Sequence, residues 1–276
     1  IAADVQHIYA AERAFAGLKA DGSAVAWGTN IKKAMEKAVG SEGLHHHFFT
    51  TSACAELQDD GSVITWGAQD TGGDCSMVQA QLAGDLQHIC STEYAFAALK
   101  AGGTVVAWGA GPGSRIHDGG NWINGDWGGD CSQVQHQLAN VQHICSTQGA
   151  FAALKAGGSV VAWGGDWAGG DSSKVQGQLA DVQHIYATDF AFAALKAGGS
   201  VVAWGLHGQP APGGRAGGDC SGVQAQLVDV QHIYSTNGAF AALKAHGSVV
   251  SWGDPNSGGD ITSDIVVKEA FMSNNP

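Results

Sequence analysis

Histidine recurs at one position of a segment that this chain repeats six times. The imidazole is the third residue of each copy, at His7, His46, His88, His143, His184 and His232. If the carrying strands line a channel, these side chains could converge on an anion or a metal and gain positive charge together near pH ~6. The alternative is that each His hydrogen-bonds to the neighbouring repeat. No Asp or Cys alternates with them at a metal-ligand spacing, so we predict no metal and no cofactor.

Aspartate recurs in a Gly-Gly-Asp motif between the copies. Its positions are Asp74, Asp130, Asp171, Asp219 and Asp260. A short carboxylate in a glycine-rich turn typically accepts hydrogen bonds from the backbone N–H groups that follow it. We therefore expect these side chains to cap turns, with shared calcium sites as the alternative.

The six cysteines stand at positions that other copies fill differently. Three share a slot with Ser172, and two share a slot with Tyr186. Positions that exchange with Ser or Tyr do not make an obligate disulfide framework, so we expect free, partly buried thiols. Such thiols favour a reducing intracellular or organellar compartment.

Tryptophan and arginine outside the repeated segment gather in three consecutive linkers, 110–127, 165–168 and 206–216. These residue types dominate interaction hot spots. The predicted partner-binding residues are Arg115, His117, Trp122, Trp127, Trp167, His207 and Arg215. The three linkers have the same place in neighbouring repeats, so they should adjoin in space. We expect a Trp122, Trp127 and Trp167 triple alanine variant to lose its partner without losing thermal stability. Solvated, unengaged loops are the alternative.

The first linker differs in kind. Residues 31–39, IKKAMEKAV, are compatible with a helix and carry Lys32, Lys33 and Lys37 in an otherwise acidic chain. This run either fills space beside the second repeat or forms a basic docking patch.

The elements that position these side chains follow from the repeat itself. The copies occupy 5–28, 44–67, 86–109, 141–164, 182–205 and 230–253. Each contains three short β-prone runs, and a glycine-rich hairpin separates the last two. The Trp near the end of each copy is expected to pack between sheets.

The linker GGD[C/S]SxVQxQL places Val and Leu four residues apart, which suits either a fourth strand or one helical turn; we favour the strand. Four short strands in about 41 residues are typical of a propeller blade. We predict an all-β, six-bladed β-propeller with four strands per blade, or seven blades with one outside this chain. The expected single domain is 1–267, followed by a tail at 268–276. Its repeats are 5–43, 44–85, 86–140, 141–181, 182–229 and 230–267.

The pattern V-x-x-I…A-L-x-x-[DG]-G-x-V-x-x-W-G resembles the regulator of chromosome condensation repeat family over nearly all of 1–267. The resemblance implies a β-propeller that acts as an interaction platform. One member exchanges nucleotide on the small GTPase Ran, and a plant relative senses ultraviolet-B through clustered Trp. This chain departs from the family pattern at Thr188, where the family has Gly, and at Ala191, where it has His. It also has G-G-D-[C/S]-S in place of the family's G-Q-L-G turn.

Composition narrows the classes of function. Lys plus Arg number 13 against 25 Asp plus Glu, a net charge of −12, which disfavours nucleic acid and anionic membranes as partners. No apolar run reaches the roughly 18 residues of a membrane span, so we expect a soluble protein without direct membrane insertion. Neither a nucleophile–base–orienter set, nor a phosphate loop, nor a catalytic metal motif is present, so we predict no enzyme.

The predicted function is a noncatalytic protein-interaction scaffold or accessory subunit. A carbohydrate-binding propeller is the alternative, because Trp platforms beside Asp118, Asn124 and Asp126 suit sugar recognition. Guanine-nucleotide exchange is a third possibility by family analogy alone.

Overall fold

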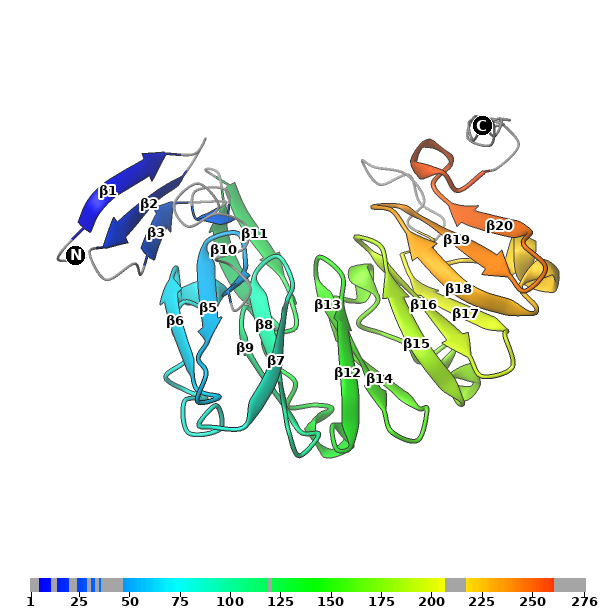
Figure 1. Ribbon diagram of the computed structural model, residues 1–276, viewed down its shortest axis with the longest axis horizontal. Helices are drawn as coiled ribbons and strands as arrows, with labels where there is room; N and C mark the ends of the chain where they lie inside the picture. The colour runs from blue at the N-terminus through cyan, green and yellow to red at the C-terminus, as the bar shows by residue number, and fades with distance from the viewer. Residues whose placement is uncertain are drawn as a thin grey trace, which may run out of the picture.

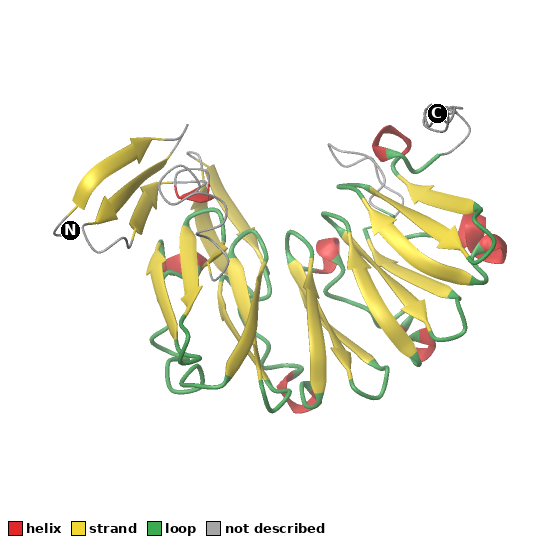
Figure 2. Ribbon diagram, viewed as in Figure 1, coloured by secondary structure: helices red, strands yellow, loops and turns green. Residues whose placement is uncertain are grey.

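The computed structural model describes residues 5–10, 14–19, 24–28, 31–32, 35, 47–118, 121–206 and 217–260. Within them the chain forms six three-stranded antiparallel sheets, here called blades 1 to 6, and one two-stranded hairpin. This confirms the all-β prediction, and Figure 2 shows strands making up the body of every blade.

Each blade follows chain order, so that its second strand lies in the middle. Blade 1 is β1 (Val5–Ala10), β2 (Ala14–Lys19) and β3 (Ala24–Gly28); blade 2 is β4 (His47–Phe49), β5 (Ala53–Leu57) and β6 (Val63–Gly67). Blade 3 is β7 (Leu86–Ser91), β8 (Ala95–Lys100) and β9 (Val105–Gly109), followed by the hairpin β10 (Ser114–Asp118) and β11 (Asn121–Gly125). Blade 4 is β12 (Val141–Ser146), β13 (Ala150–Lys155) and β14 (Val160–Gly164). Blade 5 is β15 (Val182–Ala187), β16 (Ala191–Lys196) and β17 (Val201–Gly205); blade 6 is β18 (Val230–Ser235), β19 (Ala239–Lys244) and β20 (Val249–Gly253).

The middle strand is buried on both faces because it is rich in alanine. In the AFAALK strands β8, β13 and β16, the first five residues are all buried. Alanine lets neighbouring sheets approach closely, while the phenylalanine fills the space beside the framework tryptophan. Phe151 stacks on Trp163, its cross-strand partner, with ring centroids 5.2 Å apart. Trp163 is 4% exposed and donates its indole N–H to the carbonyl oxygen of Gly128 at 3.0 Å. The predicted packing role of the framework tryptophans is confirmed here.

The blades follow one another along an arc, with blade 1 and blade 6 at its two ends (Figure 1). From blade 2 to blade 6, the first strands of successive blades contact one another: β4 with β7, β7 with β12, β12 with β15, and β15 with β18. Sheets that converge at their first strands are wedge-shaped units, which is the arrangement of propeller blades. The described residues form an open arc rather than a closed ring.

The predicted fourth strand is wrong in the described residues. The linker segments instead form turns and short 3-10 helices: η3 (Gln135–Gln137), η5 (Gln176–Gln178) and η6 (Ser221–Gln226). A side-chain hydrogen bond spanning four residues closes each turn, as between Ser172 Oγ and Gln176 Oε1 at 2.9 Å. The same glutamine donates to Val160 O at 3.0 Å, which occupies an acceptor that a fourth strand would need. The alternative reading of the Val–Leu spacing, one helical turn, was the right one.

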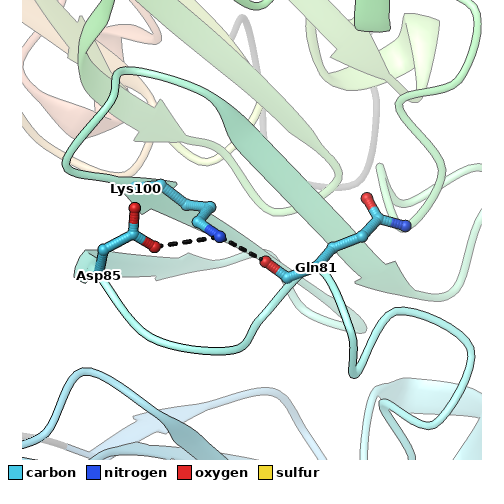
Figure 3. A network of polar contacts seen from close by, with 3 residues as sticks. All are labelled: Gln81, Asp85 and Lys100. Atoms are coloured by element: carbon cyan, nitrogen blue, oxygen red, sulfur yellow. Dashed lines mark hydrogen bonds and ion pairs between the residues drawn. The ribbon is translucent and has the colours of Figure 1, made fainter.

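A lysine at the end of the middle strand binds the linker that precedes its own blade. Lys100 Nζ donates to the carbonyl oxygen of Gln81 at 2.8 Å and lies 3.0 Å from Asp85 Oδ1 (Figure 3). Asp85 itself has a left-handed backbone, with φ of 52°, where the chain turns into β7. Asn140, Asp181 and Asp229 take the same conformation before the first strands of blades 4 to 6. Asn and Asp are the non-glycine residues that tolerate it best.

Candidate interaction face

The loops that join the first and second strands connect one blade to the next. In blades 3 to 6 we call them the junction loops: 91–94, 146–149, 187–190 and 235–238. The backbone N–H of Glu93 donates to Gln148 O at 2.8 Å, that of Gln148 to Asp189 O at 2.8 Å, and that of Asp189 to Asn237 O at 2.9 Å. Blade 2 extends this series of hydrogen bonds through Thr51, whose N–H donates to Glu93 O. These bonds place the four loops side by side at one end of the blades.

In blades 3, 4 and 6 a threonine fixes the junction loop to the linker of its own blade, and in blades 3 and 4 this threonine is buried. Thr147 Oγ1 accepts from the N–H of Ala150 at 3.0 Å and donates to the carbonyl oxygen of Ala168, in the linker, at 2.9 Å. Thr92 does the same with Ala95 and with the carbonyl oxygen of Trp127. The linkers therefore lie at the same end of the molecule as the junction loops, and together they form one face.

The two residues after this threonine vary among copies that are otherwise nearly identical. They are Glu93–Tyr94, Gln148–Gly149, Asp189–Phe190 and Asn237–Gly238. Since the flanking strands barely change, the fold tolerates different side chains here. Sequence reasoning missed these positions, although an alignment of the six copies carried the signal.

The second residue of the variable pair packs against the non-framework tryptophans. Tyr94 meets Trp127 edge-to-face at 4.5 Å, Trp127 meets Trp167 at 5.0 Å, and Trp167 lies 5.8 Å from Phe190, all between ring centroids. Gly149 leaves room for Trp167, because a Cβ there would clash with the indole ring. Four aromatic rings from blades 3 to 5 thus form one aromatic cluster, which confirms that the linkers 110–127 and 165–168 adjoin.

The members of this cluster differ in exposure. Trp127 is 5% exposed and Tyr94 is 1% exposed, whereas Trp167 is 37% exposed. A tryptophan as buried as Trp127 is part of the core. The expectation that alanine at Trp122, Trp127 and Trp167 together spares stability is therefore corrected, because Trp127 supports the fold.

The hairpin β10–β11 carries further predicted residues. Arg115 is exposed opposite Asn124, while the neighbouring Ile116 is 1% exposed and anchors the hairpin. His117 and Trp122 are cross-strand partners within it. The hairpin contacts η2 (Gln69–Thr71), in the linker of blade 2. His207 and Arg215, with most of the linker 206–216, lie outside the described residues.

The predicted basic patch is described only in part. Residues 31, 32 and 35 are helical, with Ile31 and Met35 buried and Lys32 exposed. The buried pair is spaced four apart, as an amphipathic helix requires. Lys33 and Lys37 lie outside the described residues.

The histidine row is exposed on the first strands. His88, His143, His184 and His232 all lie on the surface there, and the side chains of His7 and His46 are not described. Tyr186 Oη lies 3.2 Å from His232 Nδ1, one blade on, and Phe48 meets His88 edge-to-face at 5.6 Å. These contacts between blades fit the hydrogen-bonding alternative. Within the described part of the chain, no three His, Cys, Asp or Glu side chains are placed to share a metal ion.

The Gly-Gly-Asp carboxylates cap turns as predicted. The Oδ1 atoms of Asp74, Asp130, Asp171 and Asp219 each accept the N–H of the serine two residues on, at 2.8 Å. These bonds lower the pKa of the Asp74 and Asp171 carboxyl groups below the usual value for aspartate.

All six cysteines are free, which confirms that no disulfide framework exists. Burial raises the pKa of the Cys90 thiol to about 12 and that of Cys145 to about 11. Both are therefore protonated at neutral pH, and a protonated thiol is a poor nucleophile.

Comparisons with known proteins assign no family. No family model matches the chain, and no curated protein sequence matches it. Among solved structures it is similar to yeast RCC1 (Prp20) bound to Kap60, at 16% identity over 75% of this chain and 55% of that one, with a TM-score of 0.46. It is also similar to human WBSCR16, at 16% identity over 74% and 60%, with a TM-score of 0.42.

A third similar structure is the ectodomain of the Physcomitrella patens receptor kinase CR4, at 17% identity over 91% of this chain and 61% of that one, with a TM-score of 0.45. The chain thus spans 55 to 61% of the length of these three structures. The strand pairing of this chain places it in the class of all-β proteins built from propeller blades.

None of the helices in the described residues is long and apolar enough to cross a membrane.

Proposed function

We propose that this protein is a noncatalytic interaction scaffold or accessory subunit that binds a protein partner through the face formed by the junction loops and the linkers. The observation that carries the proposal is the position of Trp167. Its ring is held by Trp127 and Phe190 but stays 37% exposed, whereas the framework tryptophan Trp163 is 4% exposed. A partly exposed aromatic ring that is already fixed loses little conformational entropy on binding.

The surroundings of Trp167 support a protein partner. The carboxylates of Asp126 and Asp166 belong to the same two linkers, and Asp166 directly precedes Trp167. Burial raises the pKa of Asp126, and the nearby Asp130 and Asp166 act in the same direction. An aromatic anchor with charged neighbours is the usual composition of an interaction hot spot and its rim.

The noncatalytic part of the proposal rests on the chemistry of the groups present. The repeated Asp and Thr side chains make hydrogen bonds to the backbone of turns, and the Cys90 and Cys145 thiols are protonated.

We also propose the single domain 1–267 and membership of the regulator of chromosome condensation repeat family, on the strength of the repeated residues.

The experiment is affinity purification from the native source with mass spectrometry, comparing the wild type, Trp167→Ala and Ile64→Ala. Ile64 is 51% exposed on β6 and serves as the matched apolar control. We expect one set of partners to be captured by the wild type and by Ile64→Ala but lost with Trp167→Ala. Equal capture by all three proteins would refute this face as the binding surface.

Two side experiments address the other functions. A glycan array on which Trp167→Ala abolishes a positive signal would favour the carbohydrate-binding alternative. Acceleration of nucleotide release from any of a panel of small GTPases would favour exchange activity.

A further inference from the structure

The contact between neighbouring blades uses the same two surfaces from blade 2 to blade 6. One blade contributes alanine and leucine from its middle strand, and the next contributes its phenylalanine and its framework tryptophan. Between blades 5 and 6, Ala193 and Leu195 belong to one buried cluster with Phe240 and Trp252. Each blade in the series therefore has one surface for the blade before it and another for the blade after it.

Blade 6 has the surface for a following blade, but no further blade follows it within the described part of the chain. Leu243 is half-buried there, whereas the equivalent Leu195 of blade 5 is 3% exposed. Val249 is 48% exposed, against 1% for Val201. Tyr234 is 57% exposed. Strand pairing places these side chains side by side, since Tyr234 pairs with Ala241 and Leu243 pairs with Val249. We call Tyr234, Ala241, Leu243 and Val249 the outer face of blade 6.

Blade 5 shows which surface fits an outer face of this kind. Its equivalent residues pack against the first strand, the phenylalanine and the tryptophan of blade 6; they are Tyr186, Ala193, Leu195 and Val201. The chain repeats that complementary sequence in blade 1. Residues 5–9, VQHIY, are identical to 230–234. Phe15 also pairs with Trp27 across the strands, as Phe240 pairs with Trp252.

Blade 1 lies at the opposite end of the arc from blade 6 (Figure 1). Blade 1 of the same molecule therefore does not cover the outer face in this arrangement, whereas blade 1 of a second molecule has the matching sequence. An apolar surface is also the usual composition of a contact between copies of one chain.

From these observations we propose that copies of this protein associate head to tail, with the outer face of blade 6 in one copy packed against blade 1 of the next. Such a contact joins two different surfaces, so it either closes into a ring or continues as a filament. Removal of Tyr234, Leu243 and Val249 from water drives the association. The inference goes beyond the proposed function, because Trp167 does not belong to the outer face.

The first test is sedimentation velocity of the whole chain at increasing concentration. We expect the wild type to exceed the monomer mass of 28.1 kDa as its concentration rises. Leu243→Arg and Tyr234→Arg should each weaken self-association by about tenfold or more, because they bring an unpaired charge into an apolar contact. Circular dichroism checks folding. Tyr234→Arg keeps the test valid if Leu243→Arg misfolds, since Cys90 and Cys145 fill the position of Tyr234 in blades 3 and 4.

The linker of blade 2 supplies a matched control. Met77→Arg adds the same charge at a side chain that is 93% exposed. Lys174 occupies the equivalent place in the linker of blade 4, so a basic residue fits there. We expect this variant to change self-association by less than about twofold. Equal weakening by Met77→Arg and Tyr234→Arg would show a general effect of charge and would overturn the inference.

A mixing experiment tests the head-to-tail arrangement. Tagged Tyr234→Arg is immobilised and offered untagged wild type or untagged Tyr234→Arg. The tagged variant keeps its own blade 1, to which the outer face of the wild type can bind. We therefore expect it to capture the wild type but not the untagged variant. If blade 6 packed against blade 6, the tagged variant would capture neither protein, and the head-to-tail contact would be refuted.

A wild type that stays at the monomer mass at every concentration would also overturn the inference, because the outer face would then bind no second copy. Partner capture by wild type and Trp167→Ala judges the proposed function separately. Tyr234→Arg leaves Trp167 in place, so that failure of one proposal can be distinguished from failure of the other.

Discussion

Trp167 meets Trp127 edge-to-face across the boundary between two linkers, with ring centroids 5.0 Å apart and ring planes at 74°. One ring is buried and the other is partly exposed, so the same pair joins the core of the blades to their surface. Edge-to-face aromatic pairs contribute about 0.5–1.5 kcal/mol beyond the area that they bury. The pair therefore holds the candidate interaction face in a defined geometry.

Replacing each ring with alanine should separate the two roles. We expect Trp127→Ala to lower the free energy of unfolding by about 3–5 kcal/mol, because it leaves a large cavity. Trp167→Ala should lower it by less, since the ring is 37% exposed. Urea denaturation followed by circular dichroism measures both. Equal losses would contradict the division into a structural ring and a surface ring.

A methyl group at position 149 should displace Trp167 without removing it. The Cβ of Gly149→Ala would clash with the indole ring. We expect a shifted tryptophan emission and weaker capture of the partner. The control is Gly157→Ala in the β13–β14 turn, where a Cβ would have no atom within 4 Å. Unchanged emission and capture with Gly149→Ala would show that the indole tolerates the added methyl group.

The buried threonine of the junction loop should matter more than its neighbouring serine. Thr147→Val keeps the shape but leaves the N–H of Ala150 and the carbonyl oxygen of Ala168 without the hydroxyl. We expect a loss of about 1–3 kcal/mol in the free energy of unfolding, because buried polar groups lose a partner. Ser146→Ala is the control, since blade 5 has Ala187 there. Similar stability in the two variants would argue against the anchoring role of Thr147.

Acid should destabilise the protein partly through His88. Burial lowers the pKa of His88 below 6.5, and the neighbouring His143 acts in the same direction. The unfolded state therefore binds more protons below pH 6.5, so that the free energy of unfolding falls as pH decreases through that region.

We expect His88→Gln to make the fall in melting temperature between about pH 7.5 and pH 5.5 smaller. The effect should be small because the side chain is largely exposed. His136→Gln is the control, since His136 lies on η3 at a position where other repeats have Ala80, Gly177 and Ala225. A parallel pH dependence in the wild type and His88→Gln would contradict the contribution of His88.

The repeat was enough to predict most of a blade. The strand bounds, the turn-capping role of Asp130, the burial of Trp163 and the free state of the cysteines all depend on local spacing or on one repeated environment. Such features can be predicted from the sequence because every copy of the repeat has the same packing environment. The linker was misread because Val and Leu four residues apart fit two conformations. The choice between them depended on Gln176 reaching both Ser172 and the edge of its blade.

The sequence by itself determined that the chain is an array of similar β units and that its unusual tryptophans lie between them. Tertiary structure alone decided that Trp127 is core while Trp167 is surface, because exposure depends on which rings from other blades cover each one. It also decided that Glu93 and Asp189, almost a hundred residues apart, face one depression. The physical reason is the chain of backbone hydrogen bonds between junction loops, which pairs residues that no local pattern connects.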